Sequence, residues 1–211
     1  MALRARAGLM AVTIAALLAA PLAAPLAAQS LLDRVAARVN GNVILLSDVR
    51  AAVMLGLVEN AAPDSEEAVE QLVQRSLLIE EVNRFPPPDP SLEAIDAELA
   101  RLRTHAGGSL DAVERATGLS SEHVRLLARD RLRIQTYIDG RFGVTVPLTD
   151  EQVLQYYRDH PDQFTSGGQV APFEQAQGLA RERAGLEQRR RTITQWLGDL
   201  RGRADVSVPA R

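Results

Sequence analysis

The chain has 211 residues, no cysteine and a formal net charge of −3. Its length allows one domain and a small second one, and the absence of cysteine excludes a disulfide framework, a thiol nucleophile and a thiolate metal site. The slight excess of acidic residues argues against a surface that binds nucleic acid or anionic membranes.

Residues 1–28 have the pattern of a secretory signal peptide. Arg4 and Arg6 form a basic start, and an apolar run follows at 9–20. This run is too short to span a bilayer as a helix. We therefore expect cleavage that leaves a mature chain starting between Gln29 and Leu31, located in the periplasm and not inserted in the membrane.

The next stretch, 33–48, predicts a β-hairpin. A strand-favouring run from Val35 to Val39 is followed by Asn40-Gly41 and then by the apolar run 43–46. Asn-Gly suits a type I′ turn, in which both central residues need a positive φ. Two strands alone are marginally stable in water, so the hairpin needs a further partner. The strand-like run at 206–208 can supply it, and we expect the far end of the chain to return and pair with the hairpin.

After the hairpin, a helix is predicted over 48–58, and it is apolar on all sides. On a helical wheel Val53 and Leu57 fall on one side, whereas Met54 and Val58 fall on another. A helix of this kind is either buried on every side or keeps a second apolar face for a partner. The sequence leaves both readings open, with Val53 and Leu57 expected to face the core.

Most of the remaining chain predicts helices, so we expect a mainly α-helical fold. The helix at 66–84 is stopped by three consecutive prolines. Further helices are expected at about 90–106, 109–117 and 120–139. An extended connector follows at 144–147, then a helix at about 150–160 and a long helix from about 173. The expected N-caps are Ser47, Asp64 or Ser65, Asp89, Ser109, Ser120 and Thr149.

The last helix carries a stripe of apolar residues. Leu179, Leu186, Ile193 and Leu200 recur every seven residues, which is the spacing of a helix that packs along another helix. The arginine run at 189–191 is expected to be solvated or paired with acidic side chains rather than to form a binding patch.

No pattern predicts a catalytic or metal site. The three histidines, His105, His123 and His160, have no HExxH spacing and no set of further ligands. The sequence also contains no GxSxG, P-loop or GxGxxG motif. The adjacent carboxylates Glu66-Glu67 and Glu80-Glu81 are expected on solvated helix faces. We therefore expect no cofactor and no enzymatic site.

Several segments, taken in order, resemble the SurA-like family of periplasmic chaperones, which are related to the PpiD and PrsA foldases. They are VAARVNGNVILLSDV, LVQRSLLIEEVNRF, SLDAVERATGLSSEHVRLLARDRLRIQTYI, VPLTDEQVLQYYRDHPDQF, and APFEQAQ with WLGDLRGRADVSV. In that family a parvulin prolyl isomerase domain stands between the last two segments. Here only the residues from Thr165 to Ala171 lie between them, so isomerase activity is not carried over.

Together with the signal peptide that the first residues predict, the resemblance implies a chain with four parts. These are a signal peptide at 1–28, a SurA N-terminal-like helical domain at 29–165, a short flexible linker at 166–171 in place of the isomerase domain, and a C-terminal helix and strand at 172–211 that fold back on the same domain. It also implies a non-enzymatic, ATP-independent chaperone. Such a protein binds unfolded envelope proteins, with outer-membrane β-barrel precursors as the expected clients, in an apolar groove.

We expect Met54, Leu55 and Val58 of the first helix to line this groove, with Tyr157 and Phe164 behind them. For each of the five, a plain core position is the alternative. Two other functions stay open. One is a dedicated adaptor or assembly subunit that binds a single folded partner through the same surface. The other is a prolyl isomerase that works through an unrecognised site.

Overall fold

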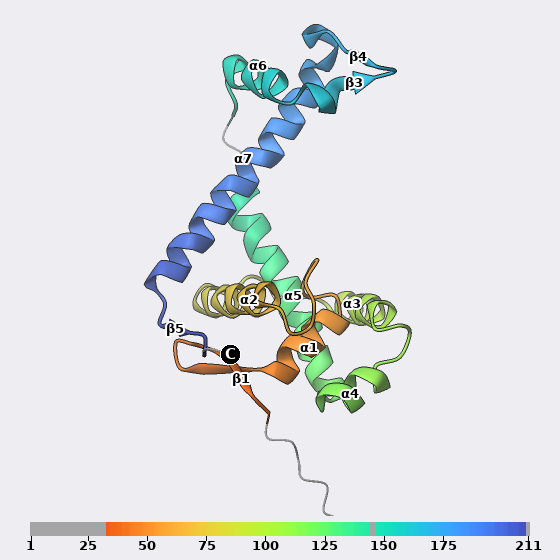
Figure 1. Cartoon of the computed structure of the whole chain (residues 1–211), viewed down its shortest axis with the longest axis vertical. Helices are drawn as coiled ribbons and strands as arrows, with labels where there is room; N and C mark the ends of the chain where they lie inside the picture. The colour runs from red at the N-terminus through yellow and green to blue at the C-terminus, as the bar shows by residue number, and fades with distance from the viewer. Residues whose placement is uncertain (1–32, 144–146, 210–211) are drawn as a thin grey trace, which may run out of the picture. The chain divides into compact units, whose positions relative to one another are not determined.

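The structure is a computed structural model that describes residues 33–143 and 147–209. The expected signal peptide with its cleavage site, and most of the connector at 144–147, lie outside these residues. Within the described part the chain is mainly α-helical, with seven α-helices and two small antiparallel sheets (Figure 1). The expected fold class is therefore confirmed.

The predicted hairpin is present. Strand β1 (Val35–Val39) pairs antiparallel with β2 (Asn42–Leu45). Between the two strands, Asn40 and Gly41 have φ values of 48° and 86°, which are the positive values that a type I′ turn requires. The local sequence thus determines where the chain reverses.

The far end of the chain closes the sheet, as predicted. Strand β5 (Val206–Ser207) pairs antiparallel with β1, which gives the strand order β2–β1–β5, and Figure 1 shows it beside β1. The Asn40 N–H donates to the Asp205 carbonyl at 2.8 Å, and the Asp205 N–H donates to Asn40 Oδ1 at 2.9 Å. The turn residue therefore also anchors the returning strand.

The helices account for most of the remaining chain. They are α1 (Leu46–Met54), α2 (Glu66–Arg84), α3 (Leu92–His105), α4 (Asp111–Thr117), α5 (Ser121–Phe142), α6 (Asp150–Asp159) and α7 (Phe173–Arg203), with the short 3₁₀ helix η1 (Pro161–Phe164) after α6. Ser65, Ser120 and Thr149 are N-caps as expected, because each side chain accepts a hydrogen bond from the backbone N–H three residues later.

Three of the expected N-caps are wrong. The hydroxyl of Ser91, not the carboxylate of Asp89, caps α3, and Asp89 instead forms an ion pair with Arg129 at 2.7 Å. Ser109 lies two residues before α4 and accepts a hydrogen bond from the Asp111 N–H. Ser47 lies inside the first turn of α1, one residue after the helix begins.

Helix α1 is shorter than predicted and lies between two parts of the core. Val49 and Ala52 pack in a cluster with the sheet and α2. Ala51 and Leu55 pack in a second cluster, with side chains of α3, α4 and α5. Of the two readings of this helix, burial on both apolar sides is therefore the one observed. The chain leaves the helix at Gly56, whose φ of 64° suits glycine.

The first half of α7 buries a different face from the predicted stripe. Leu179 and Leu186 are 42% and 54% exposed, whereas Ala176, Ala180 and Ala184 are buried. Helix α6 packs along this half of α7, and small side chains every four residues let two helices approach closely. The expected seven-residue contact is therefore wrong here.

The segment expected as a flexible linker is a second, two-stranded sheet. Strand β3 (Thr165–Ser166) pairs antiparallel with β4 (Gln169–Val170). Gly167 and Gly168 form the turn, with φ values of 60° and 82°. The division of the chain into domains at this segment stays a prediction.

The arginine run on α7 is paired at both ends, in keeping with the expectation. Arg189 contacts Asp139 of α5 at 2.5 Å, and Arg191 pairs with Glu187 one turn earlier on its own helix. A hydrogen bond from Gln135, and to a smaller extent one from Arg189, holds the pKa of Asp139 below its ordinary value. This contact therefore favours the folded state above the ordinary carboxyl pKa and is lost as the pH falls through the lowered one.

Candidate functional site

The structure does not bring the five predicted groove residues together. Leu55 is fully buried and Val58 is only 7% exposed, and they belong to two different core clusters. Met54 is half-buried and packs against the same cluster as Leu55. The expectation that Leu55 and Val58 face an open groove is wrong, because core side chains cover α1 on both of its apolar sides.

Tyr157 and Phe164 lie in a third cluster, formed by α6, η1 and the start of α7. The Tyr157 hydroxyl donates to the Ala171 carbonyl at 2.6 Å, and its ring centroid lies 5.0 Å from that of Phe164. Phe164 is buried, with the Arg183 guanidinium 5.6 Å from its ring centroid. These contacts give both aromatic residues a part in holding α6 against α7. Their part in client binding stays a prediction.

An apolar cavity does open beside α1, but on the side of Leu57. It lies between α1, α2 and the start of α5 and has a volume of about 240 Å³. We call it the leucine pocket. Its leucine walls are formed by Leu57, Leu72, Leu119, Leu126 and Leu127.

The size of the leucine pocket indicates what it can hold. Pockets that bind whole small molecules usually enclose roughly 300–1,000 Å³, so this one suits a single large apolar side chain. Leu126 is 50% exposed at its border. A half-exposed leucine beside an apolar cavity leaves hydrophobic surface that a binding partner can cover.

The polar groups of the leucine pocket are already engaged within the protein. Arg75 donates through Nη2 to the Leu127 carbonyl at 3.1 Å, and burial lowers the pKa of its guanidinium. His123 Nδ1 lies 2.9 Å from the Ser120 hydroxyl. Asp48 accepts a hydrogen bond from a backbone N–H at the start of α1. The pocket therefore presents apolar surface with few free polar atoms, which favours apolar side chains over charged ones.

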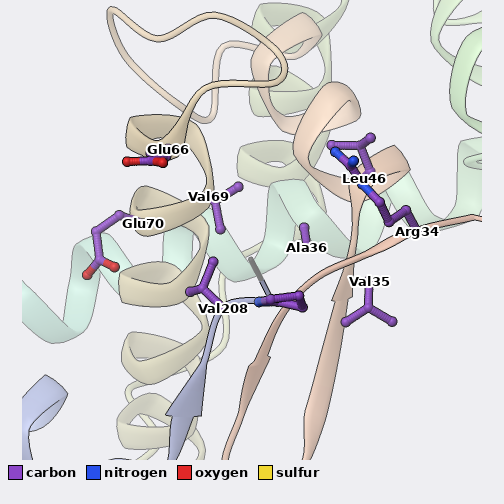
Figure 2. Close-up of a pocket in the computed structure, with 9 residues that line it drawn as sticks. Arg34, Val35, Ala36, Leu46, Glu66, Val69, Glu70 and Val208 are labelled. Carbon is purple, nitrogen blue, oxygen red and sulfur yellow. The ribbon is translucent and has the colours of Figure 1, made fainter. Parts of the chain in front are cut away.

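A second cavity lies at the end of the three-stranded sheet, and we call it the strand pocket. It has a volume of about 580 Å³ and is lined by β1, α2, the start of α1 and the residues after β5. Figure 2 shows Ala36, Val69 and Val208 around it. Arg34 and Glu66 also line it.

A third cavity, of about 460 Å³, lies between α3 and α5 around Glu98. This carboxylate is 3% exposed and lies 3.2 Å from Arg101 and 3.3 Å from Arg131. Arg131 also donates to the Gly56 carbonyl at 3.2 Å. Because a buried charge needs such partners, we interpret the group as a structural tie between α3, α5 and the end of α1.

The sequence reasoning missed the leucines of α5 that line the leucine pocket. Leu126 carries a signal that could have found it, because it adjoins Leu127 but falls off the buried stripe of Val124 and Ala128. An apolar residue beside the core stripe of a helix has no core to fill. The pocket itself could not be seen, since three helices that are distant in sequence form it.

Neither a group of metal-binding side chains nor a membrane-spanning helix is found in residues 33–143 and 147–209. No three histidine, aspartate or glutamate side chains there come together as a group that could hold a metal ion. No helix of this part is both long and apolar enough to cross a membrane.

Comparison with known proteins assigns no family to the chain. No model of a known protein family matches it, and no curated protein matches it. The resemblance to SurA-like chaperones stays a prediction from the sequence segments.

Proposed function

We propose that the protein is an ATP-independent chaperone of the periplasm that binds unfolded envelope proteins, with outer-membrane β-barrel precursors as clients. The observation that supports this most directly is the leucine pocket, a side-chain-sized apolar cavity with a half-exposed leucine at its border. Unfolded chains expose apolar side chains that folded proteins bury, so a pocket of this kind distinguishes the two.

The energy of such a contact is modest. Full burial of one Leu or Phe side chain is worth about 1.5–3 kcal/mol, and part of this is lost to ordering of the bound chain. One pocket therefore binds a client segment weakly. A client with many apolar side chains rebinds repeatedly, and this keeps it in solution without ATP. The client is released once those side chains are buried in its own fold.

Other exposed apolar side chains support binding by many weak contacts. Phe85 and Leu186 are each more than half exposed. Phe85 directly follows α2, and Leu186 lies on α7. Scattered positions of this kind are common on protein surfaces, so we assign the main contact to the leucine pocket, where a cavity accompanies the exposed side chain.

Leu126→Gln is expected to weaken client binding about five-fold. The change removes about 1 kcal/mol of apolar contact at the pocket border. Gln is a good helix former, and the position is half exposed, so the free energy of unfolding should change by less than about 1 kcal/mol. Both quantities can be measured, by the concentration that halves aggregation of a denatured outer-membrane protein and by urea unfolding.

Leu92→Gln is the matched control, since the same change is made at a leucine that is 71% exposed and does not line the pocket. It should leave client protection within about two-fold of the unchanged protein, because substitution of an isolated exposed side chain has little effect. Equal losses in the two variants would argue against the leucine pocket as the main contact.

The function itself is tested by the unchanged mature protein. It should suppress aggregation of a urea-denatured outer-membrane protein that is diluted into buffer without ATP. Failure to do so, together with capture of one folded partner in stoichiometric amount, would favour the adaptor function instead. A peptide proline-isomerisation assay run alongside tests the remaining alternative.

The proposed location gives a separate prediction. Protein recovered from the periplasmic fraction should have a first residue between Gln29 and Leu31, because the basic start and apolar run at 4–20 direct export and cleavage. N-terminal sequencing measures this directly. Uncleaved protein in the cytoplasm would contradict an exported chaperone.

A further inference from the structure

We propose that Asn40 is a site of spontaneous deamidation, and that strand β5 protects it for as long as β5 stays paired with β1. Deamidation then marks molecules whose C-terminal strand has separated from the sheet, and it weakens the re-pairing of that strand. The modification is independent of client binding at the leucine pocket, because its only co-reactant is water.

The reactive pair is Asn40-Gly41, which forms the turn of the hairpin. Asparagine deamidates when the backbone nitrogen of the next residue attacks its side-chain carbonyl carbon. Glycine in the next position hinders this attack least, because it has no side chain. No other asparagine in the chain precedes a glycine. Both residues of the pair are exposed, so water has access to the site.

The reaction balances with water alone. The Gly41 nitrogen forms a bond to Asn40 Cγ, the bond from Cγ to Nδ2 breaks, and the Gly41 N–H proton leaves with Nδ2 as ammonia. The product is a five-membered succinimide ring. Water then opens the ring at either of its two carbonyl carbons. One opening gives aspartate, and the other gives isoaspartate, in which the backbone runs through the former side-chain carbon.

The pairing of β5 restrains the reacting amide. Asn40 Oδ1 accepts a hydrogen bond from the Asp205 N–H at 2.9 Å, and the Asn40 N–H donates to the Asp205 carbonyl at 2.8 Å. We call these two hydrogen bonds the closing contact. Ring closure pulls Cγ onto the Gly41 nitrogen and rotates the amide, so the hydrogen bond to Oδ1 has to break first. The reaction is therefore slower while β5 is in place.

A second restraint acts on the nitrogen of the same amide. Asn40 Nδ2 donates to Glu80 Oε2 of α2 at 2.6 Å, and Asn42 Nδ2 donates to Glu80 Oε1 at 3.3 Å. Hydrogen bonds to a charged group are stronger than those between neutral groups. Glu80 thus ties the hairpin turn to α2, and the Asn40 amide is held at both its oxygen and its nitrogen.

Both products of deamidation weaken the closing contact. Isoaspartate adds one carbon to the backbone before Gly41, so the two-residue turn changes shape and residue 40 no longer fits against Asp205. Aspartate keeps the backbone, but it places a second carboxylate where Glu80 had a hydrogen-bond donor, and two like charges at this distance repel each other. A temporary separation of β5 is thereby converted into a lasting one.

The protection is tested by incubating the mature protein in mildly alkaline buffer and following the Asn40 peptide by mass spectrometry. Deletion of residues 204–211 removes the closing contact. Asn40 should then deamidate at least about five-fold faster, which is the factor that one hydrogen bond contributes to an equilibrium. Deletion of residues 209–211 leaves β5 paired and should keep the rate within about two-fold of the unchanged protein. Equal rates in the two truncated proteins would overturn the proposal.

A second pair of variants keeps the test decisive if the longer deletion does not fold. Glu80→Ala removes the acceptor for Asn40 Nδ2 without touching β5, and alanine favours the helix. Glu81→Ala is the matched control, because this neighbouring carboxylate pairs with Arg84. Asn40 should deamidate at least about five-fold faster in Glu80→Ala than in Glu81→Ala. Equal rates would show that holding the amide does not slow the reaction, and would also overturn the proposal.

The structural consequence is tested on the deamidated protein itself. Anion exchange separates it from the unmodified protein, since the conversion adds one negative charge. Deuterium uptake at residues 204–209 should be at least about five-fold faster in the deamidated fraction, because β5 separates more often. Uptake in α3, which belongs to the other core cluster, should be the same in both fractions. Equal uptake at residues 204–209 would contradict the coupling between Asn40 and β5 and overturn the proposal.

Discussion

Deletion of residues 204–211 should lower the melting temperature of the mature protein by about 6–12 °C. The deletion removes β5 and with it the packing of Ala204 and Val206 against the core cluster under the sheet. It also removes the two hydrogen bonds between Asn40 and Asp205. Partial burial of one Val and two hydrogen bonds together contribute about 3 kcal/mol. In a protein of this size each kcal/mol shifts the melting temperature by about 2–4 °C.

A truncation that begins at Pro209 is the matched control, since it leaves the pairing of Val206 and Ser207 with β1 intact. Its melting temperature should stay within about 2 °C of the unchanged protein, because the paired strand and its buried side chain remain. Scanning calorimetry measures both variants. A loss in the control as large as in the longer deletion would show that pairing of β5 is not the source of the stability.

Leu55→Ala, at the residue that directly follows α1, should lower stability more than any single change within α1. The Leu55 side chain is fully buried, and it is among the largest of the fully buried side chains in the described residues. It packs with Ile95, Leu102 and Val113 of the neighbouring helices. Truncation of a buried leucine leaves a cavity and usually costs about 2–5 kcal/mol. Urea unfolding, read as a midpoint change at constant m-value, measures the loss.

Val53→Ala is the comparison for Leu55→Ala. The Val53 side chain is half-buried at the border of the other cluster, so its truncation should cost about 1 kcal/mol. The sequence led to the opposite order, with Val53 in the core and the face of Leu55 free for clients. A Leu55→Ala variant that unfolds at the same urea concentration as the unchanged protein would restore that reading.

The features that the sequence predicts well depend on chemistry within a few residues. Asn40-Gly41 determines the hairpin because both residues accept a positive φ. Ser120 and Thr149 begin their helices because each can accept a hydrogen bond from an N–H that no helical carbonyl reaches. Even the long-range pairing of β5 follows from a local observation, namely a hairpin that lacks a partner strand.

The orientation of α1 could not be predicted, because its apolar residues occur on every side. Periodicity identifies a buried face only where polar residues mark the opposite one. The structure resolves the ambiguity by placing a core cluster on each side, with Val49 in one and Leu55 in the other.

A related limit applies to α7. The sequence predicted that its leucines pack against another helix, whereas its alanines form the contact with α6. Leu186 is exposed and Ala180 is fully buried, because close approach of α6 selects small side chains rather than large ones. The leucine pocket has the same origin in tertiary structure. It depends on how α1, α2 and α5 meet, which no pattern along one segment contains.

The arrangement of the three-stranded sheet has a consequence for the way the protein is made. Synthesis begins at the N-terminus, so the hairpin is complete long before Asp205, which contacts a residue 165 positions earlier. Contacts this distant in sequence form late, because a long loop must close first. Throughout that time the nascent chain exposes the whole edge of β1, together with the apolar side chains that β5 later covers. An open strand edge of this kind pairs readily with other chains. Until α7 and β5 have been made, the protein itself therefore has the properties of a chaperone client.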